Sequence, residues 1–453
     1  MSDITKDSWG ATAVRLAAAI KARELTAVQA LENQLSRIEA LNPALNAVVS
    51  LDADGARAQA HAVDAAIAAG AASGPLAGVP ITLKDGIDVA GLRTTLGTPM
   101  LDRVADTDAT VAARLKAAGA VILGHSNVAP FLGDFQTNNP IFGRSNNPWD
   151  LARTPGGSSG GAAAAVAAGL SCFELASDLA GSIRQPAALC GVYGLKPSEH
   201  VVPMTGFFRA PGPRPVRVLS CLGPLARSLD DLELILRVVG GPDGLDQEIA
   251  PVSLGDAAPC ALSGLRIAVA PELPFSKPAG DISASVERLA GALEAAGAQV
   301  TRALPACDWG AALGVFGELA TELTQPEQTR SLGWYLGALH QRDAFMASWQ
   351  RFFTEVDFGI WPGAVCAAYP HAEPGAVIDV DGARVPYYAQ VAPLIPANLA
   401  AIPALAVPGG RDAQGLPLGL QILGPRWRDL ELIGFAKALE AAGALPGFDW
   451  PAL

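Results

Sequence analysis

Apolar residues recur at helical spacing through the first 70 residues of the chain. Between Thr12 and Ala40 this spacing predicts two amphipathic helices, and Thr26 is placed to cap the second. An alanine-rich run predicts a third helix over about residues 53–69, which ends at Gly70. We therefore expect residues 1–70 to form an N-terminal group of helices.

Short apolar runs that end in turn residues alternate with helices in the next stretch. Residues 78–84 predict a strand that ends in the polar turn Lys84-Asp85-Gly86. A helix is predicted over 109–118 and a buried strand over 121–123. This order of strand, helix and strand is typical of an α/β architecture.

The pattern loosens after Gly194. A loop with aromatic and arginine residues is predicted over 203–216, and a linker-like segment over 240–263. The helices expected in this half cover residues 229–239, 282–296, 316–353 and 429–442. The strands expected there cover residues 265–269, 299–300, 359–361, 403–407 and 419–423.

Both halves of the chain contribute strands of similar type, and there is no internal repeat. We expect one large sheet in a single domain over residues 1–453 rather than two independent domains. Within that domain, residues 71–240 form the core that carries the motifs described below. Residues 241–453 supply the rest of the sheet, the substrate-side helices and a C-terminal helix.

Composition excludes several classes of partner. Half of the residues are hydrophobic and 17% are charged, which provides for a large core. A net charge of −12, without any Lys/Arg run, argues against a nucleic-acid partner. The polar N-terminus has no apolar signal region, and no run supplies the ~20 strongly apolar residues of a membrane span. We expect a cytoplasmic protein with no membrane association.

The cysteines do not form a metal-binding pattern. None is part of a CxxC pair, and none has a histidine at zinc spacing. We expect no metal and free thiols in a reducing compartment at Cys172, Cys190, Cys221, Cys260, Cys307 and Cys366.

Two glycine-rich clusters carry serines. Ser158 and Ser159 lie within residues 156–161, directly before an alanine-rich run that favours a helix. A glycine-rich loop before a helix can direct amide groups at an anion, but a phosphate loop would also need a Gly-Lys-Ser/Thr ending, which is missing. A bound nucleotide is therefore not expected.

Residues 156–160 also match the G-x-S-x-G nucleophile elbow. That elbow should follow a buried strand, whereas the preceding residues 148–155 resemble a loop. It would also need a histidine, for which His200, His340 and His371 are available without a supporting context. This interpretation remains an alternative in which Ser158 is the nucleophile.

Ser182 follows small residues whose amide groups can converge on one point, as an oxyanion hole requires. Asp178 and Arg184 flank this loop and could pair to hold it. An ordinary strand-to-helix turn is the alternative interpretation. Lys84, at the end of its strand, would be a solvated lysine if exposed, whereas burial would lower its pKa and make it a neutral base for a hydroxyl.

Together these segments resemble the amidase signature family. The resemblance rests on ITLKDGIDVAG around Lys84, TPGGSSGG around Ser158 and DLAGSIRQPAALCGVYGLKPS around Ser182. The two serines are 24 positions apart, as in that family. Further similar segments are DATVAARLKAAGAVILGHSNVAPF, NNPIFGRSNNPWD, GPLARSLDD, PANLAAIPALAVPGG and LPLGLQILGP.

The resemblance implies a single α/β domain with a mixed sheet between layers of helices. It implies a Ser–Ser–Lys triad in which Lys84 is the base, Ser158 relays the proton from a cis peptide after Gly157, and Ser182 is the nucleophile. No metal or cofactor is implied. The oxyanion hole would consist of the amides of Leu179, Ala180, Gly181 and Ser182.

The chain departs from the family pattern at four positions. Ala180 replaces a usual glycine, so its methyl group could reshape the oxyanion loop. His125 and Ala129 replace a common Lys and Glu, where we expect effects on substrate access alone. Ala162 replaces a usual serine, and we expect no effect there.

We expect a permissive hydrolase for small-molecule amides, and also for carbamates or esters, as in urethanase-like members of the family. One alternative is a glutamine-hydrolysing subunit of a tRNA-dependent amidotransferase, which shares the QPA segment after Arg184. The altered oxyanion loop and the acidic charge argue against it. A catalytically inactive binding protein is the other alternative. The candidates for a bulky apolar site, or simply for core packing, are Phe207, Phe208, Arg209, Trp334, Tyr335, Phe345, Trp349 and Phe352.

Overall fold

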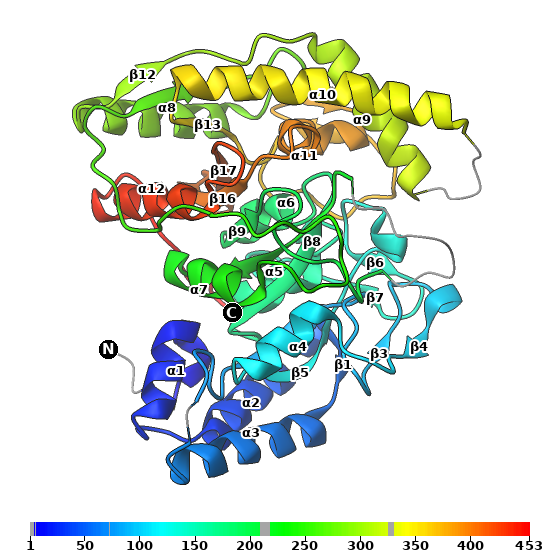
Figure 1. Ribbon diagram of the computed structural model, residues 1–453, viewed down its shortest axis with the longest axis vertical. Helices are drawn as coiled ribbons and strands as arrows, with labels where there is room; N and C mark the ends of the chain where they lie inside the picture. The colour runs from blue at the N-terminus through cyan, green and yellow to red at the C-terminus, as the bar shows by residue number, and fades with distance from the viewer. Residues whose placement is uncertain (1–3, 5, 72, 209–217, 325–329) are drawn as a thin grey trace.

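Two adjoining β-sheets run through the centre of the molecule in the computed structural model, which describes residues 4, 6–71, 73–208, 218–324 and 330–453 (Figure 1). The larger sheet has eight strands in the order β12-β11-β13-β17-β16-β9-β10-β8, and the smaller has the order β1-β5-β2. Parallel pairs (β11 with β12 and β13, β2 with β5) occur beside antiparallel ones, so the sheet is mixed. The strands are β1 (Val48–Leu51), β2 (Pro80–Lys84), β5 (Val121–Ser126), β8 (Phe173–Asp178), β9 (Tyr193–Lys196), β10 (Cys221–Ala226), β11 (Arg266–Val269), β12 (Gln299–Thr301), β13 (Phe358–Pro362), β16 (Ala404–Arg411) and β17 (Pro417–Leu423).

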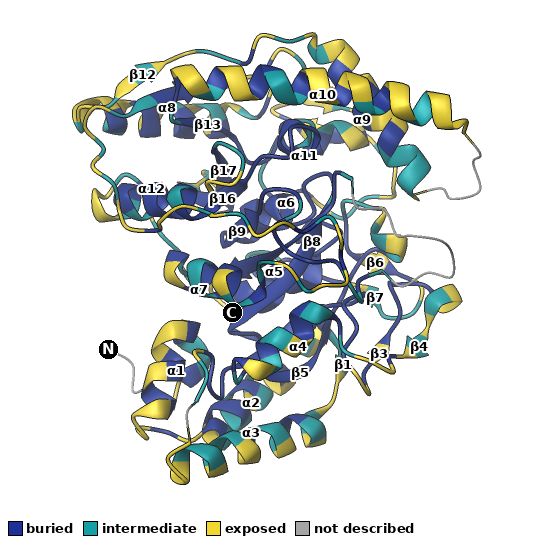
Figure 2. Cartoon of the chain, in the orientation of Figure 1, coloured by how far each residue is buried: buried dark blue, intermediate teal, exposed yellow. Residues whose placement is uncertain are grey.

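Helices cover these sheets, with their apolar sides buried and their outer sides exposed (Figure 2). The single-domain α/β class and the mixed sheet between helices are confirmed. Three small hairpins, β3–β4, β6–β7 and β14–β15, lie within residues 93–104, 138–144 and 378–385. The helices are α1 (Ala13–Lys21), α2 (Ala27–Leu45), α3 (Ala53–Ala68), α4 (Thr110–Ala117), α5 (Gly160–Ala167), α6 (Arg184–Cys190), α7 (Leu229–Val239), α8 (Gly280–Ala295), α9 (Trp309–Thr324), α10 (Leu332–Glu355), α11 (Ile395–Leu399) and α12 (Asp429–Ala441).

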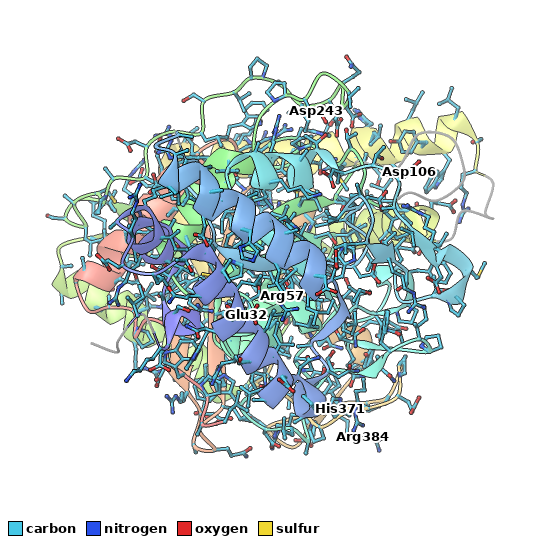
Figure 3. The ribbon with its side chains drawn as sticks, turned by 90° about the horizontal axis from the view of Figure 1, so that it is seen from below. Glu32, Arg57, Asp106, Asp243, His371 and Arg384 are labelled. Atoms are coloured by element: carbon cyan, nitrogen blue, oxygen red, sulfur yellow. The ribbon has the colours of Figure 1, made fainter. Side chains whose placement is uncertain are left out.

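Local capping explains why the N-terminal helices start where the sequence predicts. The Thr26 side chain accepts a hydrogen bond from the Gln29 amide, and the Gln29 side chain accepts one from the Thr26 amide. Glu32 and Arg57 then point toward one another and join α2 to α3, with 2.7 Å between Glu32 Oε1 and Arg57 Nε (Figure 3). Capping and packing together fix this pair of helices against the small sheet.

Side chains close the seam where the two sheets meet, between β2 and β8. The Thr82 amide donates to Ser171 Oγ at 2.9 Å, and the Thr82 hydroxyl donates to the Glu174 carboxyl. Lys84 Nζ reaches Ser177 Oγ at 2.9 Å. Polar side chains in this buried seam are thus brought together by the fold itself.

Two parts of the sequence-based prediction are wrong. The predicted helical segment over 316–353 falls on two helices, α9, which ends at Thr324, and α10, which begins at Leu332. The strands β8, β9 and β10 were not predicted, although they form one end of the large sheet. In the described part of the chain, no helix is long and apolar enough to cross a bilayer.

Candidate active site

Lys84 is fully buried at the end of β2 and faces two serines. Its Nζ lies 2.8 Å from Ser158 Oγ, 2.9 Å from Ser177 Oγ and 3.4 Å from the Ser177 carbonyl oxygen. Sequence reasoning predicted the approach to Ser158 but missed Ser177. The packing of the two sheets that brings β8 beside β2 has no local sequence signal.

The surroundings of Lys84 favour the neutral amine. Burial lowers the pKa of its ammonium to about 7, although Asp178 and Glu174 act to raise it. A neutral amine has two N–H groups and one lone pair. The two oxygens of Ser177 can accept both N–H groups, which leaves the lone pair for the proton of Ser158.

Close packing of the backbone shapes the glycine-rich loop that carries Ser158. The Gly157–Ser158 peptide bond is cis. A Cβ at Gly157 would lie 2.7 Å from backbone atoms of residues 134–136, so only glycine fits. Thr137 Oγ1 donates to the Gly156 carbonyl at 3.0 Å and accepts from the Gly160 amide at 2.9 Å, and α5 begins at Gly160.

The nucleophile-elbow interpretation of this loop is wrong. Residues 151–157 form no strand before Ser158. Within the described chain, no histidine contacts Ser158 or Ser182. His371 Nε2 lies 3.0 Å from Asn146 Oδ1, and His200 lies beside Glu199.

The loop that carries Ser182 lies between β8 and α6 and is held in shape by Asp178. This buried carboxylate accepts hydrogen bonds from the amides of Gly181 (2.8 Å) and Ile183 (3.1 Å) and pairs with Arg184 at 3.0 Å. The predicted pairing of Asp178 with Arg184 is confirmed. Burial would raise the pKa of Asp178, but the Arg184 guanidinium and the Asn398 amide hold it well below its usual range.

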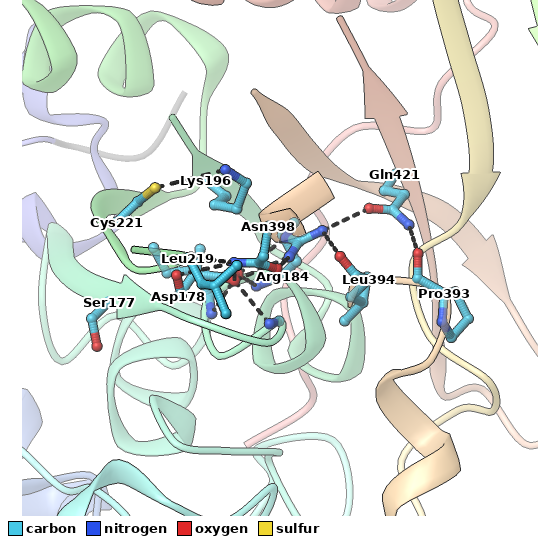
Figure 4. Close-up of polar contacts among 12 residues, drawn as sticks. Ser177, Asp178, Arg184, Lys196, Leu219, Cys221, Pro393, Leu394, Asn398 and Gln421 are labelled. Atoms are coloured by element: carbon cyan, nitrogen blue, oxygen red, sulfur yellow. Dashed lines mark hydrogen bonds and ion pairs between the residues drawn. The ribbon is translucent and has the colours of Figure 1, made fainter. Parts of the chain in front are cut away.

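A second layer of polar groups fixes Arg184 in turn (Figure 4). Its guanidinium donates to the Leu394 carbonyl at 2.9 Å, to Gln421 Oε1 at 3.0 Å and to Asn398 Oδ1 at 2.5 Å. Asn398 Nδ2 also donates to Asp178 Oδ1 at 3.0 Å. Residues more than 200 positions apart thus determine the shape of the Ser182 loop.

Three of the four predicted oxyanion amides are available in this conformation. The Gly181 amide is committed to Asp178. In the stretch 73–208, which the structure describes without a gap, the amides of Leu179, Ala180 and Ser182 donate to no acceptor. Ala180 is not in the left-handed region, so its methyl group imposes no backbone strain, and it packs in an apolar cluster with Leu219.

The hydroxyl-bearing side chains of Ser158 and Ser182 are both buried. Ser158 is 1% exposed and Ser182 6% exposed. Both lie in the described region, and no hydrogen bond connects their Oγ atoms. The Lys84–Ser158 link is therefore present, whereas the Ser158–Ser182 link stays a prediction.

We expect Gly181→Ala to lower activity on the order of 10²-fold and stability by about 2 kcal/mol. Gly181 has a φ of +108°, and a Cβ there would lie 2.4 Å from Leu394 Cδ1. The matched control is Ala180→Gly, which removes a methyl group at an unstrained position and should change little. Assays and thermal melts of both variants test this, and equal losses would contradict it.

Of the departures from the family pattern, His125 and Ala129 are both fully buried side chains. His125 is fully buried, with its ring nitrogens 2.9 Å from the carbonyl oxygens of Arg93 and Ile87, so it supports a loop instead of a substrate path. Ala129 is buried, and its amide lies 3.4 Å from the Ser158 carbonyl. Ala162 packs in an apolar cluster with Ile183.

The aromatic candidates fall into two groups. Phe345, Trp349 and Phe352 are buried in one cluster with Ala180, and Trp334 and Tyr335 pack against it. Phe207 and Phe208 instead belong to the main core, and Arg209 lies outside the described residues. The cluster also contains Trp361, which the sequence analysis did not single out.

A half-open pocket of about 410 Å³ adjoins the Ser158 loop, and its lining includes Asp134, Gln136, Arg144 and Tyr388. The backbone of residues 134–136 packs directly on Gly157. Burial raises the pKa of Asp134, although the Tyr387 hydroxyl, 2.7 Å away, acts to lower it. A pocket lined by polar side chains thus lies beside the apolar cluster.

The cysteines are free thiols, and Cys172, Cys190 and Cys221 are buried. Among the residues that the structure describes, no group of three or more His, Cys, Asp or Glu side chains could hold a metal ion.

Known proteins share both the sequence and the fold of this chain. The Amidase family profile matches residues 29–313 and 315–433. A glutamyl-tRNA(Gln) amidotransferase subunit from Roseiflexus sp. (strain RS-1) is 36% identical over 92% of this chain and 93% of its own length.

Two solved structures are similar over nearly the whole chain. One belongs to a vestigial protein complex linked to the origins of an s-triazine catabolic enzyme, with a TM-score of 0.83, 30% identity and coverage of 97% of this chain and 100% of that chain. The other is a bacterial aryl acylamidase of the amidase signature family, with a TM-score of 0.83, 25% identity and coverage of 96% and 97%.

Proposed function

Since the chain belongs to the amidase (amidase signature) family, we propose that it hydrolyses the C–N bond of a carboxamide through an acyl-enzyme on Ser182. Lys84 and Ser158 carry the proton. The observation that carries this proposal is the fully buried amine of Lys84, 2.8 Å from a serine hydroxyl and with a pKa near neutrality.

Acylation begins when the Ser182 hydroxyl turns onto Ser158 Oγ. Ser158 accepts its proton and passes its own to the Lys84 lone pair as Ser182 Oγ attacks the carbonyl carbon. The amides of Leu179, Ala180 and Ser182 receive the developing oxyanion. The C–N bond then breaks as Ser158 gives its proton to the leaving nitrogen and takes one back from Lys84, which is neutral again.

Deacylation repeats the relay with water in place of Ser182. Water gives its proton to Ser158 as its oxygen attacks the ester carbon, and Ser182 recovers its proton when the carboxylic acid leaves. In both steps, no ionisable side chain other than Lys84 has to change its protonation state. Asp178 and Arg184 keep the loop in place throughout.

The substrate class we propose is an amide with an apolar acyl or aryl group, with carbamates and esters as further substrates. Ala180 packs with Leu219, Trp361 and Ala397, and Phe135 and Ile395 lie against the same cluster. These apolar side chains would favour the binding of an apolar substrate group, and burial of an unpaired charge against them would cost free energy. The charged residues of the loop, Asp178 and Arg184, are already paired with each other.

A second candidate is the glutamine-hydrolysing subunit of a tRNA-dependent amidotransferase. It is favoured by the 36% identity to a relative of that name over 92% of this chain. The pocket that contains Asp134 and Arg144 offers charges of both signs, which the ammonium and carboxylate of glutamine would need.

A substrate panel distinguishes the two candidates. We expect an apolar-acyl p-nitroanilide to be hydrolysed at least tenfold faster in kcat/KM than glutamine or γ-glutamyl p-nitroanilide. Carbamates and esters matched to this amide substrate then show in which order the three bond types are hydrolysed. Turnover of glutamine alone would reject the first candidate in favour of the second. An inactive binding protein would turn over nothing and would not react with a fluorophosphonate.

A further inference from the structure

Glu174 is a fully buried carboxyl group that the mechanism above does not use. It lies on β8, and its Oε1 accepts a hydrogen bond from the Thr82 hydroxyl across the seam. Ser126 of β5 adjoins the same carboxyl. Glu174 Oε2 is buried and has no hydrogen-bond partner among the described residues, which is a costly environment for a carboxylate.

The fold places this carboxyl on the side of β2 from which the Lys84 side chain also projects. Thr82 and Lys84 are alternate residues of β2, so both side chains leave the same face of the strand. Thr82 reaches Glu174, Lys84 reaches Ser177, and Ser126 is the register partner of Lys84 on β5. Neither Lys84 nor Glu174 forms a salt bridge within the described chain.

We propose that Glu174 is a positioning residue that controls the protonation of Lys84: as a neutral carboxylic acid it leaves the lysine free to serve as a neutral base, and when ionised it holds a proton on that lysine. This inference rests on the proposed function. Burial raises the pKa of Glu174 to about 8, although Thr82, Ser126 and Lys84 act to lower it. The two groups therefore titrate as a coupled pair across neutral pH.

Other ionisable groups around the pair have fixed partners. Asp178 of β8 is paired with Arg184, and Asp85, which follows Lys84, accepts hydrogen bonds from Thr94 and Thr95. His125 of β5 has its two ring nitrogens 2.9 Å from the carbonyl oxygens of Arg93 and Ile87, and one N–H donates to one of them. The α5 helix, which packs on β2 and β8, contains only glycine, alanine and valine. Glu174 is left as the partner whose charge can change with that of Lys84.

The test is the pH dependence of Ser182 labelling by a fluorophosphonate in the wild type and in Glu174→Gln. The amide keeps the shape of the side chain but cannot ionise. We expect labelling of the variant to rise at a pH lower by about half to one unit, because no carboxylate can hold the proton on Lys84. We also expect the second inflection, near pH 8 in the wild type, to disappear.

Thr82→Val is the matched control, since it removes the same hydrogen bond without removing an ionisable group. Because the lost hydrogen bond acts to lower the pKa of Glu174, the second inflection of Thr82→Val should move to higher pH but should not disappear. Superimposable profiles of Glu174→Gln and wild type, or an equal shift in Thr82→Val, would overturn the inference. Glu174→Ala repeats the test if the glutamine variant does not fold. An unlabelled wild type at every pH would instead reject the proposed function.

Discussion

Replacement of Ser182 by alanine should lower kcat on the order of 10⁴- to 10⁶-fold, because it removes the proposed nucleophile and with it the acyl-enzyme. Reaction with a fluorophosphonate should disappear at the same time. The fold should persist, because Ser182 Oγ donates no hydrogen bond to the described residues and its loss leaves no buried partner unpaired. Substrate assays, intact-protein mass spectrometry and a thermal melt measure these three effects.

Two neighbouring serines provide the comparison. Ser159→Ala changes a buried serine in the same region, whose Oγ makes only a 3.4 Å contact with the Ser177 carbonyl, and it should retain most activity. Ser158→Ala should lose activity through the relay. A label that survives Ser182→Ala but disappears in Ser158→Ala would identify Ser158 as the nucleophile and refute the proposed mechanism.

Periodicity and capping made most of the helices and the later strands predictable. The predicted helix over 229–239 coincides with α7, where Ser228 accepts a hydrogen bond from the Asp231 amide. The strands β8, β9 and β10 could not be found in this way. All their residues are buried, so they show no alternation of polar and apolar side chains, and glycine-rich loops adjoin them. The division of the predicted helix into α9 and α10 did have a sequence signal, because Pro326 lies between them and a proline in a helical pattern favours a helix end.

The sequence predicted the site residues that lie in short local motifs. It did not predict the residues that reach the site only through the fold. Glycine and serine spacing, read with the family resemblance, identified the loops of Ser158 and Ser182 and the lysine before them. Ser177, Glu174 and Asn398 were missed, because each acts across a strand pairing or a separation of more than 70 residues. Their roles depend on which strands become neighbours, and no short segment encodes that.

Lys84→Met should abolish measurable turnover, a loss on the order of 10³- to 10⁵-fold, because among the residues that the structure describes no other base contacts Ser158. It should also make the folded chain more stable at neutral pH. The pKa of Lys84 falls from 10.5, the ordinary value, to about 7 on folding, so the unfolded chain binds more protons between these limits. Below pH 7 this burial costs roughly 5 kcal/mol, which methionine avoids.

The sign of this effect makes the prediction specific. Wild-type stability attributable to Lys84 should rise with pH from about 7 to 10.5, so the advantage of Lys84→Met should shrink across that window. Lost hydrogen bonds to Ser158 and Ser177 reduce the net gain at pH 7 to about 2 kcal/mol. Urea unfolding at about pH 7 and pH 9.5 measures the difference. Lys116→Met, which removes a partly exposed lysine paired with Asp108, controls for the loss of one positive charge. If the Lys84 variant were less stable than wild type at pH 7, or if the difference did not change with pH, Lys84 would be charged in the folded chain and could not act as the base.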